Sequence, residues 1–219
     1  MASRPKQPTP RQAPRLYLIT PPVADASAVT EQLASAMDAG DIAAVLLKLA
    51  EADERTLINC TKKLAPIIQD KGAALLLDGH VELVARAGAD GAHLRDLAAF
   101  TEAFHQLKPD RIAGVGGLTT RHDAMVAAER GADYVMFGEP GPGGSAPAFG
   151  AVEERVAWWA ELFEIPCVGY AASLENIEPL VTAGADFVAV GDFVWRDPQT
   201  LAMTIREATR FLQLPEPAA

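Results

Sequence analysis

The chain has 219 residues, of which 49% are hydrophobic, and this length and composition suit one globular domain with a sizeable core. Its formal net charge is −10, and no Lys/Arg cluster follows the first fifteen residues, which argues against the basic surface that a nucleic-acid-binding protein needs. No segment approaches the roughly 18 uninterrupted apolar residues of a membrane span, so no membrane association is expected.

The two ends of the chain differ in composition from the part between them. Residues 1–14 contain four prolines and scattered charges, and they are expected to form a disordered tail, as are residues 214–219. Residues 15–213 form the predicted domain. Its cysteines, Cys60 and Cys167, lie far apart and in no Cys-x-x-Cys motif, so neither a disulfide nor a zinc site is expected, and a cytoplasmic location is predicted.

A repeated tripeptide marks the boundaries between predicted helices and strands. Gly-Ala-Asp occurs at residues 88–90, 131–133 and 184–186, with a degenerate Ala-Gly-Asp at 39–41. Glycine adopts the left-handed conformation that ends a helix, and a short polar turn then leads into a strand. Successive copies are separated by enough residues for two strand–helix units, so the pattern indicates an α/β protein.

Eight apolar segments, mostly continuous rather than alternating, are typical of parallel strands that are covered on both faces. They lie at residues 16–20, 43–48, 73–78, 91–94, 112–116, 134–138, 166–170 and 187–191. Helical patterns follow at residues 29–37, 54–70, 81–86, 97–107, 121–129, 152–163, 174–181 and 198–212. Eight strands that are each followed by a helix predict a single-domain (β/α)8 TIM barrel. An open doubly wound sheet is the alternative, but no G-x-G-x-x-G turn follows the first strand, and no nucleotide cofactor is expected.

TIM-barrel proteins carry their functional residues at the C-terminal ends of the strands and in the loops that follow, a region called the rim below. We therefore expect a small-molecule ligand there. The candidate residues at the rim are Thr20, Lys48, Asp78, His93, Arg95, Asp96, Gly116, Gly117, Gly138, Glu139, Gly169, Tyr170, Gly191 and Asp192.

Several of these candidates have a second, purely structural interpretation. Asp78 and Asp192 are also suited to cap helices, His93 to pack as a hydrogen-bonded core residue, and Lys48 to extend into solvent. The glycine-rich loop 140–145 either binds an anion through its backbone N–H groups or is a mobile connection. The Trp158-Trp159 pair is expected to pack against the barrel or against a partner chain, which leaves a homodimer open.

The sequence resembles the thiamine phosphate synthases and their sister family, the thiazole tautomerases, over about residues 16–195. The segments that carry the resemblance lie at residues 16–20, 77–84, 88–94, 131–138 and 184–190. The resemblance implies a TIM barrel and a reaction that joins an aminopyrimidine methyl diphosphate to a thiazole phosphate, with Mg²⁺ assisting the loss of diphosphate. Such a site needs cations and N–H donors.

The resemblance also implies roles for individual residues. Lys48 and Arg95 would be catalytic and hold the diphosphate. Asp78 would bind Mg²⁺, and the second ligand would be Asp96 if two residues are deleted from the pattern, or Ala98 otherwise. The residues expected to bind substrate are His93, Gly116, Gly138, Glu139, Gly169, Tyr170, Gly191 and Asp192.

The sequence departs from the family's pattern at most of its polar positions. Gln-Leu-Arg-Glu-Lys after the second strand is replaced at residues 46–50, where Lys48 keeps one positive charge, and the Ser after the fifth strand is Gly116. Thr-x-Thr-Lys after the sixth strand becomes residues 143–146, and the phosphate-side Ser after the eighth strand becomes Asp192. A carboxylate there opposes a phosphate.

These departures leave three functional hypotheses. The first is a thiamine phosphate synthase with a rebuilt site. The second is a family member with altered or lost catalysis, which binds a related small metabolite or acts through protein contacts. The third is another phosphate-using barrel enzyme with Lys48 or Glu139 as its catalytic residue.

Overall fold

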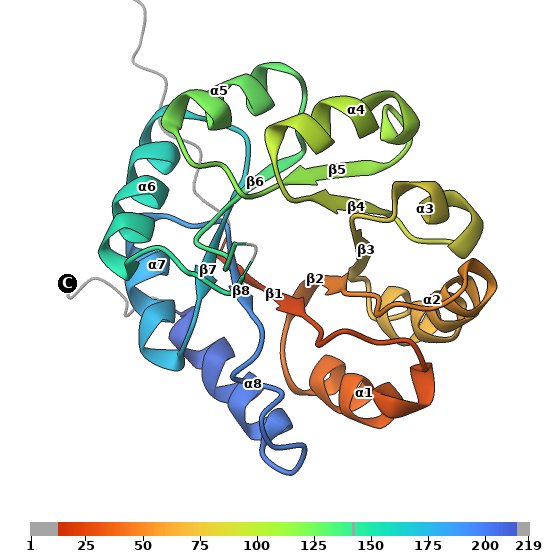
Figure 1. Cartoon of the computed structure of the whole chain (residues 1–219). Coiled ribbons are helices and arrows are strands. Elements are labelled where there is room, and N and C mark those ends of the chain that lie inside the picture. Colours follow the sequence, from red (N-terminus) through yellow and green to blue (C-terminus); the bar gives the residue numbers. More distant parts are fainter. Residues whose placement is uncertain (1–12, 142, 214–219) are drawn as a thin grey trace, which may run out of the picture.

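The computed structural model describes residues 13–141 and 143–213. In this part of the chain, eight parallel strands close into a barrel in chain order, with β8 pairing with β1, and the helices form a ring around it (Figure 1). The predicted single-domain (β/α)8 barrel is therefore confirmed. The predicted tails at 1–14 and 214–219 lie outside the described residues, apart from residues 13 and 14. Along the described chain, no helix has both the length and the apolar character needed to cross a bilayer.

The predicted elements are found with small shifts at their ends. The strands are β1 (Arg15–Ile19), β2 (Ile42–Leu47), β3 (Ala74–Asp78), β4 (Gly91–Leu94), β5 (Ile112–Val115), β6 (Tyr134–Phe137), β7 (Cys167–Ala171) and β8 (Phe187–Val190). The helices are α1 (Thr30–Ala39), α2 (Glu54–Gln69), α3 (Val81–Ala87), α4 (Leu97–Leu107), α5 (Arg121–Glu129), α6 (Phe149–Leu162), α7 (Ile177–Ala183) and α8 (Leu201–Phe211). Two short 3₁₀ helices, η1 (Ala26–Ala28) and η2 (Leu174–Asn176), precede α1 and α7.

The helix predicted at 198–212 begins later than expected. Residues 197–200 form a turn in which Thr200 N–H donates to the Asp197 carbonyl at 3.2 Å, and the Asp197 carboxylate accepts Gln199 N–H at 2.9 Å. This local bonding competes with the helix, so α8 starts only at Leu201.

Each Gly-Ala-Asp repeat joins two neighbouring strands through its aspartate. The backbone N–H of the aspartate donates to the carbonyl of one residue in the preceding strand, and its carboxylate accepts the N–H of that same residue. The pairs are Asp90 with Leu75 (2.8 and 2.7 Å), Asp133 with Ala113 (3.0 and 2.7 Å) and Asp186 with Cys167 (3.0 and 2.9 Å). We call this arrangement the aspartate clamp. It holds β4 to β3, β6 to β5 and β8 to β7 at the end of the barrel opposite the rim.

The degenerate copy at residues 39–41 uses a different contact. The Asp41 carbonyl accepts Leu16 N–H at 3.2 Å, but the Asp41 carboxylate binds the guanidinium of Arg15 on β1, with Nε–Oδ2 at 2.9 Å. Its glycine also differs. Gly88, Gly131 and Gly184 have φ of 77°, 94° and 97°, as predicted, whereas Gly40 is extended, with φ −152°. The prediction of a left-handed cap is therefore wrong for Gly40, where a Cβ would lie 2.8 Å from Ile205 Cγ2 of α8.

The interior of the barrel combines apolar and hydroxyl-bearing side chains. Its buried residues are Tyr17, Ile19, Ala44, Leu46, Leu76, Tyr134, Met136, Val168, Tyr170 and Ala189. They alternate along their strands, as inward-facing residues do. The Tyr134 ring crosses to the neighbouring strand β5, where a Cβ on Gly114 would overlap it. A second, larger apolar core fills the space between the strands and the surrounding helices.

The Trp158-Trp159 pair on α6 packs against the barrel, which was one of its two predicted roles. Trp159 is fully buried, stacks on Phe163 with ring centroids 4.1 Å apart, and donates its indole N–H to the Ile165 carbonyl at 2.8 Å. Trp158 is half-buried, with the Arg121 guanidinium 4.8 Å from its ring centroid. The homodimer stays a prediction, since one chain is described.

Candidate functional site

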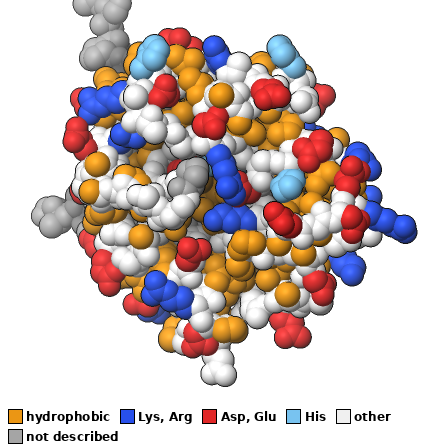
Figure 2. Space-filling view, viewed as in Figure 1, with side chains coloured by type: hydrophobic (Ala, Val, Ile, Leu, Met, Phe, Trp, Pro, Cys, Tyr) orange, Lys and Arg blue, Asp and Glu red, His pale blue; other side chains and the backbone are white. Residues whose placement is uncertain are grey.

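The structure brings most of the predicted site residues together around the rim. Asp78 ends β3 and is in register with His93, near the end of the neighbouring strand β4, and Arg95 follows β4. Gly116 follows β5 and Glu139 follows β6. Figure 2 shows Lys and Arg side chains near the centre of one face, with acidic side chains placed around them.

The predicted metal ligand Asp78 and the predicted cation Arg95 bind each other. Arg95 Nε donates to Asp78 Oδ1 at 2.8 Å, and Arg95 Nη2 donates to Asp78 Oδ2, which makes the pair bidentate. The Asp78 side chain is 4% exposed, whereas that of Arg95 is 68% exposed. This hydrogen bond raises the pKa of Arg95. A carboxylate and a guanidinium that neutralise each other leave less charge for a metal ion or a diphosphate. The helix-cap alternative for Asp78 is wrong, because the residue at the N-cap of α3 is His80.

His93 belongs to a chain of hydrogen bonds that runs into the barrel. Its Nδ1 lies 3.0 Å from the Tyr134 hydroxyl, which lies 2.8 Å from the Tyr17 hydroxyl. All three residues are buried. The other ring nitrogen, Nε2, lies 3.7 Å from Glu139 Oε1. His93 is thus a hydrogen-bonded core residue, as its structural interpretation predicted. Its second ring nitrogen also faces the Glu139 carboxylate at the rim. Neither tyrosine was among the predicted site residues. A signal was present, because Tyr17 lies within the first apolar segment and Tyr134 directly follows a Gly-Ala-Asp repeat.

Glu139 occupies space that a side chain at position 116 would fill. Its Oε1 accepts the Gly117 N–H at 2.6 Å, and a Cβ added to Gly116 would overlap this oxygen and lie 2.8 Å from His93 Nε2. Its Oε2 is buried and has no hydrogen-bond partner among the described residues. Gly116 and Glu139 were both predicted as site residues, but the sequence did not reveal that the glycine admits the carboxylate.

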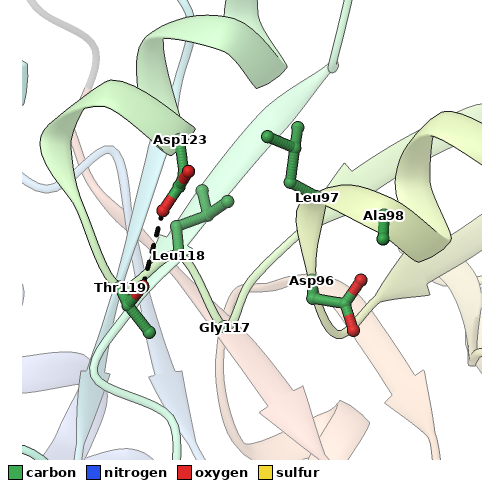
Figure 3. A pocket seen from close by; sticks show the side chains of 7 residues that line it. All are labelled: Asp96, Leu97, Ala98, Gly117, Leu118, Thr119 and Asp123. Carbon is green, nitrogen blue, oxygen red and sulfur yellow. Dashed lines mark hydrogen bonds between the residues drawn. The ribbon is translucent and has the colours of Figure 1, made fainter.

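A shallow hollow of about 300 Å³ lies beside this group (Figure 3). It is lined by Asp96, Leu97, Ala98, Gly117, Leu118, Thr119 and Asp123. Asp96 caps α4, because its Oδ1 accepts Ala99 N–H at 2.7 Å, and Asp123 accepts the Thr120 hydroxyl at 2.7 Å in the capping box of α5. Both acids therefore already stabilise helix starts.

The predicted Mg²⁺ ligands do not form a metal site in this arrangement. Asp78 is engaged by Arg95, and Asp96 by the start of α4. Over residues 13–141 and 143–213, no group of three or more His, Cys, Asp or Glu residues is placed to hold a metal ion. The Mg²⁺ ion remains an expectation from the resemblance.

Comparison with known proteins decides the family. The family model described as thiamine monophosphate synthase matches residues 16–194. The chain belongs to the thiamine monophosphate synthase family. It is 40% identical to the thiamine-phosphate synthase of Rhodospirillum centenum over 202 residues, which cover 91% of this chain and 98% of that protein. It is 38% identical to that of Hyphomonas neptunium over 208 residues, which cover 90% and 93% of the two chains.

Solved structures support the same fold. The thiamine phosphate pyrophosphorylase from Pyrococcus furiosus superposes with a TM-score of 0.73 at 21% identity, over 92% of this chain and 96% of that one. The 3-hexulose-6-phosphate synthase from Salmonella typhimurium reaches 0.67 at 14% identity, over 90% and 98%. At these identities the likeness shows the barrel alone.

The remaining predicted residues of this family member lie on the rim but do not all face the same space. Lys48 is half-buried, and its backbone N–H donates to the Thr20 hydroxyl at 3.1 Å. No ion pair within the described chain engages its amine. Asp192 is exposed in a turn where Val194 N–H donates to the Gly191 carbonyl at 3.0 Å. The helix-cap alternative for Asp192 is therefore wrong, since no helix begins there.

Two predicted glycines face helices rather than the centre of the rim. A Cβ on Gly169 would lie 2.8 Å from Leu180 Cδ2 of α7, and one on Gly138 would lie 2.7 Å from Val152 Cγ1 of α6. Their small size lets α6 and α7 approach the strands of the family's barrel. Tyr170, next to Gly169, faces inward, and its hydroxyl would lie 3.6 Å from a Cβ on Gly191.

The three tyrosines of this family member are expected to stay protonated in the native protein. Burial is the largest cause that raises the pKa of Tyr17, Tyr134 and Tyr170, and nearby carboxylates add to it. Unfolded tyrosines ionise near pH ~10, so above that pH the unfolded state loses protons that the folded state keeps, and stability falls as pH rises.

An alkaline titration followed by tyrosinate absorbance checks this expectation. We expect the absorbance of the native protein to appear only with loss of its circular dichroism, whereas the protein in guanidinium chloride should titrate near pH ~10. A step near that pH in the still-folded protein would show that the network is open to solvent.

Proposed function

We propose that this member of the thiamine monophosphate synthase family no longer performs the coupling reaction and instead binds a related small metabolite, without phosphate groups, at its rim. The observation that carries the proposal is the charge of the rim. Arg95 is bound by Asp78, and Glu139 and Asp192 add two further carboxylates. Among the described residues of the rim, Lys48 and Arg196 are the cations that no ion pair engages.

This charge distribution opposes phosphorylated ligands. Two like charges about 4 Å apart repel by about 1–4 kcal/mol between water and a surface-like dielectric. The two phosphorylated substrates of the family's reaction carry several negative charges, and such leaving groups depend on cations and N–H donors. The loop after β6, residues 138–148, contains no Lys or Arg, and Ala146 stands where the family's pattern has a lysine.

The family's own activity is the second candidate function. The name of the Rhodospirillum centenum relative, at 40% identity over almost all of its length, favours it. The Arg95 side chain is 68% exposed, so its guanidinium is free to leave Asp78 for a diphosphate, which would release the Asp78 carboxylate for Mg²⁺.

One assay separates the two candidates. The purified full chain is incubated with the aminopyrimidine methyl diphosphate, the thiazole phosphate and MgCl₂, and the Rhodospirillum centenum relative serves as the positive control. We expect no thiamine phosphate above the level without protein. Product formation at a rate comparable to the relative's would overturn the proposal and establish the second candidate.

Restoring the family's residues should restore phosphate binding. The double variant Asp192→Ser, Ala146→Lys removes one carboxylate and adds one cation, so we expect it to bind inorganic phosphate at least about tenfold more tightly than the unchanged protein. Isothermal titration calorimetry measures the difference, with the exposed Asp110→Ser, Ala85→Lys pair, which lies away from the rim, as a charge-matched control. Equal phosphate affinity in all three proteins would show that rim charge does not set ligand choice.

A further inference from the structure

One carboxylate oxygen in the rim is buried without a hydrogen-bond partner. Glu139 Oε2 has none among residues 13–141 and 143–213, although the side chain as a whole remains 17% exposed. Most buried polar atoms in proteins are paired, and leaving an acceptor unpaired costs the free energy of its desolvation. An unpaired oxygen in a side chain that is itself still partly exposed therefore indicates a partner that comes from outside the chain.

The position of this oxygen is fixed by its neighbours. Glu139 Oε1 accepts Gly117 N–H at 2.6 Å, and Gly116 has no Cβ to displace the carboxylate. His93 Nε2 lies 3.7 Å from Oε1, and the His93 ring is itself held by the Tyr134 hydroxyl. With one oxygen anchored, the second is presented in a defined direction, which is what a selective ligand contact requires.

The chemistry of the oxygen defines the group that it can bind. A carboxylate accepts hydrogen bonds and repels anions, and a hydrogen bond to a charged acceptor is about twice as strong as one between neutral groups. In this structure the guanidinium of Arg95 binds Asp78 through two hydrogen bonds. Asp192 adds negative charge to the same rim. An N–H donor on a neutral or cationic ligand suits this environment.

We propose that Glu139 Oε2 accepts a hydrogen bond from an amino or amidine N–H group of the ligand, so that the rim selects amine-bearing small molecules. This inference rests on the proposed function, which places a ligand without phosphate groups at the rim. Both residues are needed to place the acceptor. Glu139 supplies the carboxylate, and Gly116 leaves the space that the carboxylate occupies.

Two probes of the same shape test the inference. 4-Aminopyrimidine and 4-methylpyrimidine differ in one amino group that donates hydrogen bonds, and their affinities for the full chain are measured by NMR titration. We expect the amino compound to bind at least about tenfold more tightly than the methyl compound. In Glu139→Gln, Oε1 still accepts Gly117 N–H but an NH₂ group replaces Oε2, so this preference should disappear.

A matched variant and a stability measurement complete the test. Glu154→Gln changes an exposed glutamate on α6, paired with Arg121, and should keep the preference. If Glu139 served the fold alone, Glu139→Gln would lower the melting temperature, whereas a ligand-binding oxygen without a partner predicts no loss.

Equal binding of the two probes, no binding of either, or an unchanged preference in Glu139→Gln would overturn the inference. Formation of thiamine phosphate in the coupling assay would overturn the proposed function alone, because the probes are measured without Mg²⁺ or a second substrate.

Discussion

Replacing Gly116 with serine, the residue found in the family's pattern, is expected to lower the free energy of unfolding by about 1–3 kcal/mol. The added Cβ would overlap Glu139 Oε1, and it would lie 2.8 Å from the ring nitrogen Nε2 of His93. The Glu139 carboxylate would have to move away and lose its hydrogen bond from Gly117 N–H. Urea denaturation of Gly116→Ser and the unchanged protein measures the cost.

The second half of this experiment is a double-mutant cycle. In Glu139→Ala the space beside Gly116 is empty, so adding Gly116→Ser there should cost much less, with a coupling of about 1 kcal/mol or more between the two sites. If Gly116→Ser costs the same in both backgrounds, the glycine is required for a reason other than the carboxylate.

Replacing Trp159 with alanine is expected to destabilise the barrel by about 3–5 kcal/mol. The side chain is fully buried between α6 and the barrel, and its loss would remove the stacking on Phe163 and leave the Ile165 carbonyl without the indole N–H. Chemical denaturation monitored by circular dichroism, which does not depend on tryptophan emission, measures the change.

The neighbouring residue provides the control for this prediction. Trp158 is half-buried and contacts Arg121 at the surface, so Trp158→Ala should cost clearly less than Trp159→Ala. Equal costs would contradict the packing described for α6. If Trp158 instead contacts a partner chain, its alanine variant would change the mass measured by light scattering.

The fold could be predicted because its signals are local and repeated. A glycine that ends a helix and an apolar run that follows it are readable from the chain alone, and Gly88, Gly131 and Gly184 have the conformation that this reading requires. Gly40 shows the limit of the reasoning. The side chains of Ile205 and Thr209 on α8 pack where a Cβ at this position would lie. Contacts between residues so far apart in sequence cannot be predicted from the local pattern.

The positions of the site residues were predictable, but their pairings were not. Parallel strands place their ends on one rim, so Asp78 and His93 were expected together and are found in register. The bond from Arg95 to Asp78 and the fit of Glu139 over Gly116 depend on side-chain rotamers, which the sequence does not specify. For Gly169 and Tyr170 a signal was available. Consecutive strand residues face opposite sides, so these two could not both face the barrel interior.

The aspartate clamps also have a consequence for how the barrel is assembled. Each clamp joins an odd-numbered strand to the even-numbered strand after it, and the Arg15–Asp41 contact does the same for β1 and β2. The cylinder is thus built from four strand pairs, each closed by contacts of its own near the base. Loops that connect one pair to the next leave every clamp within an unbroken segment, which makes them the natural places to open the chain for circular permutation.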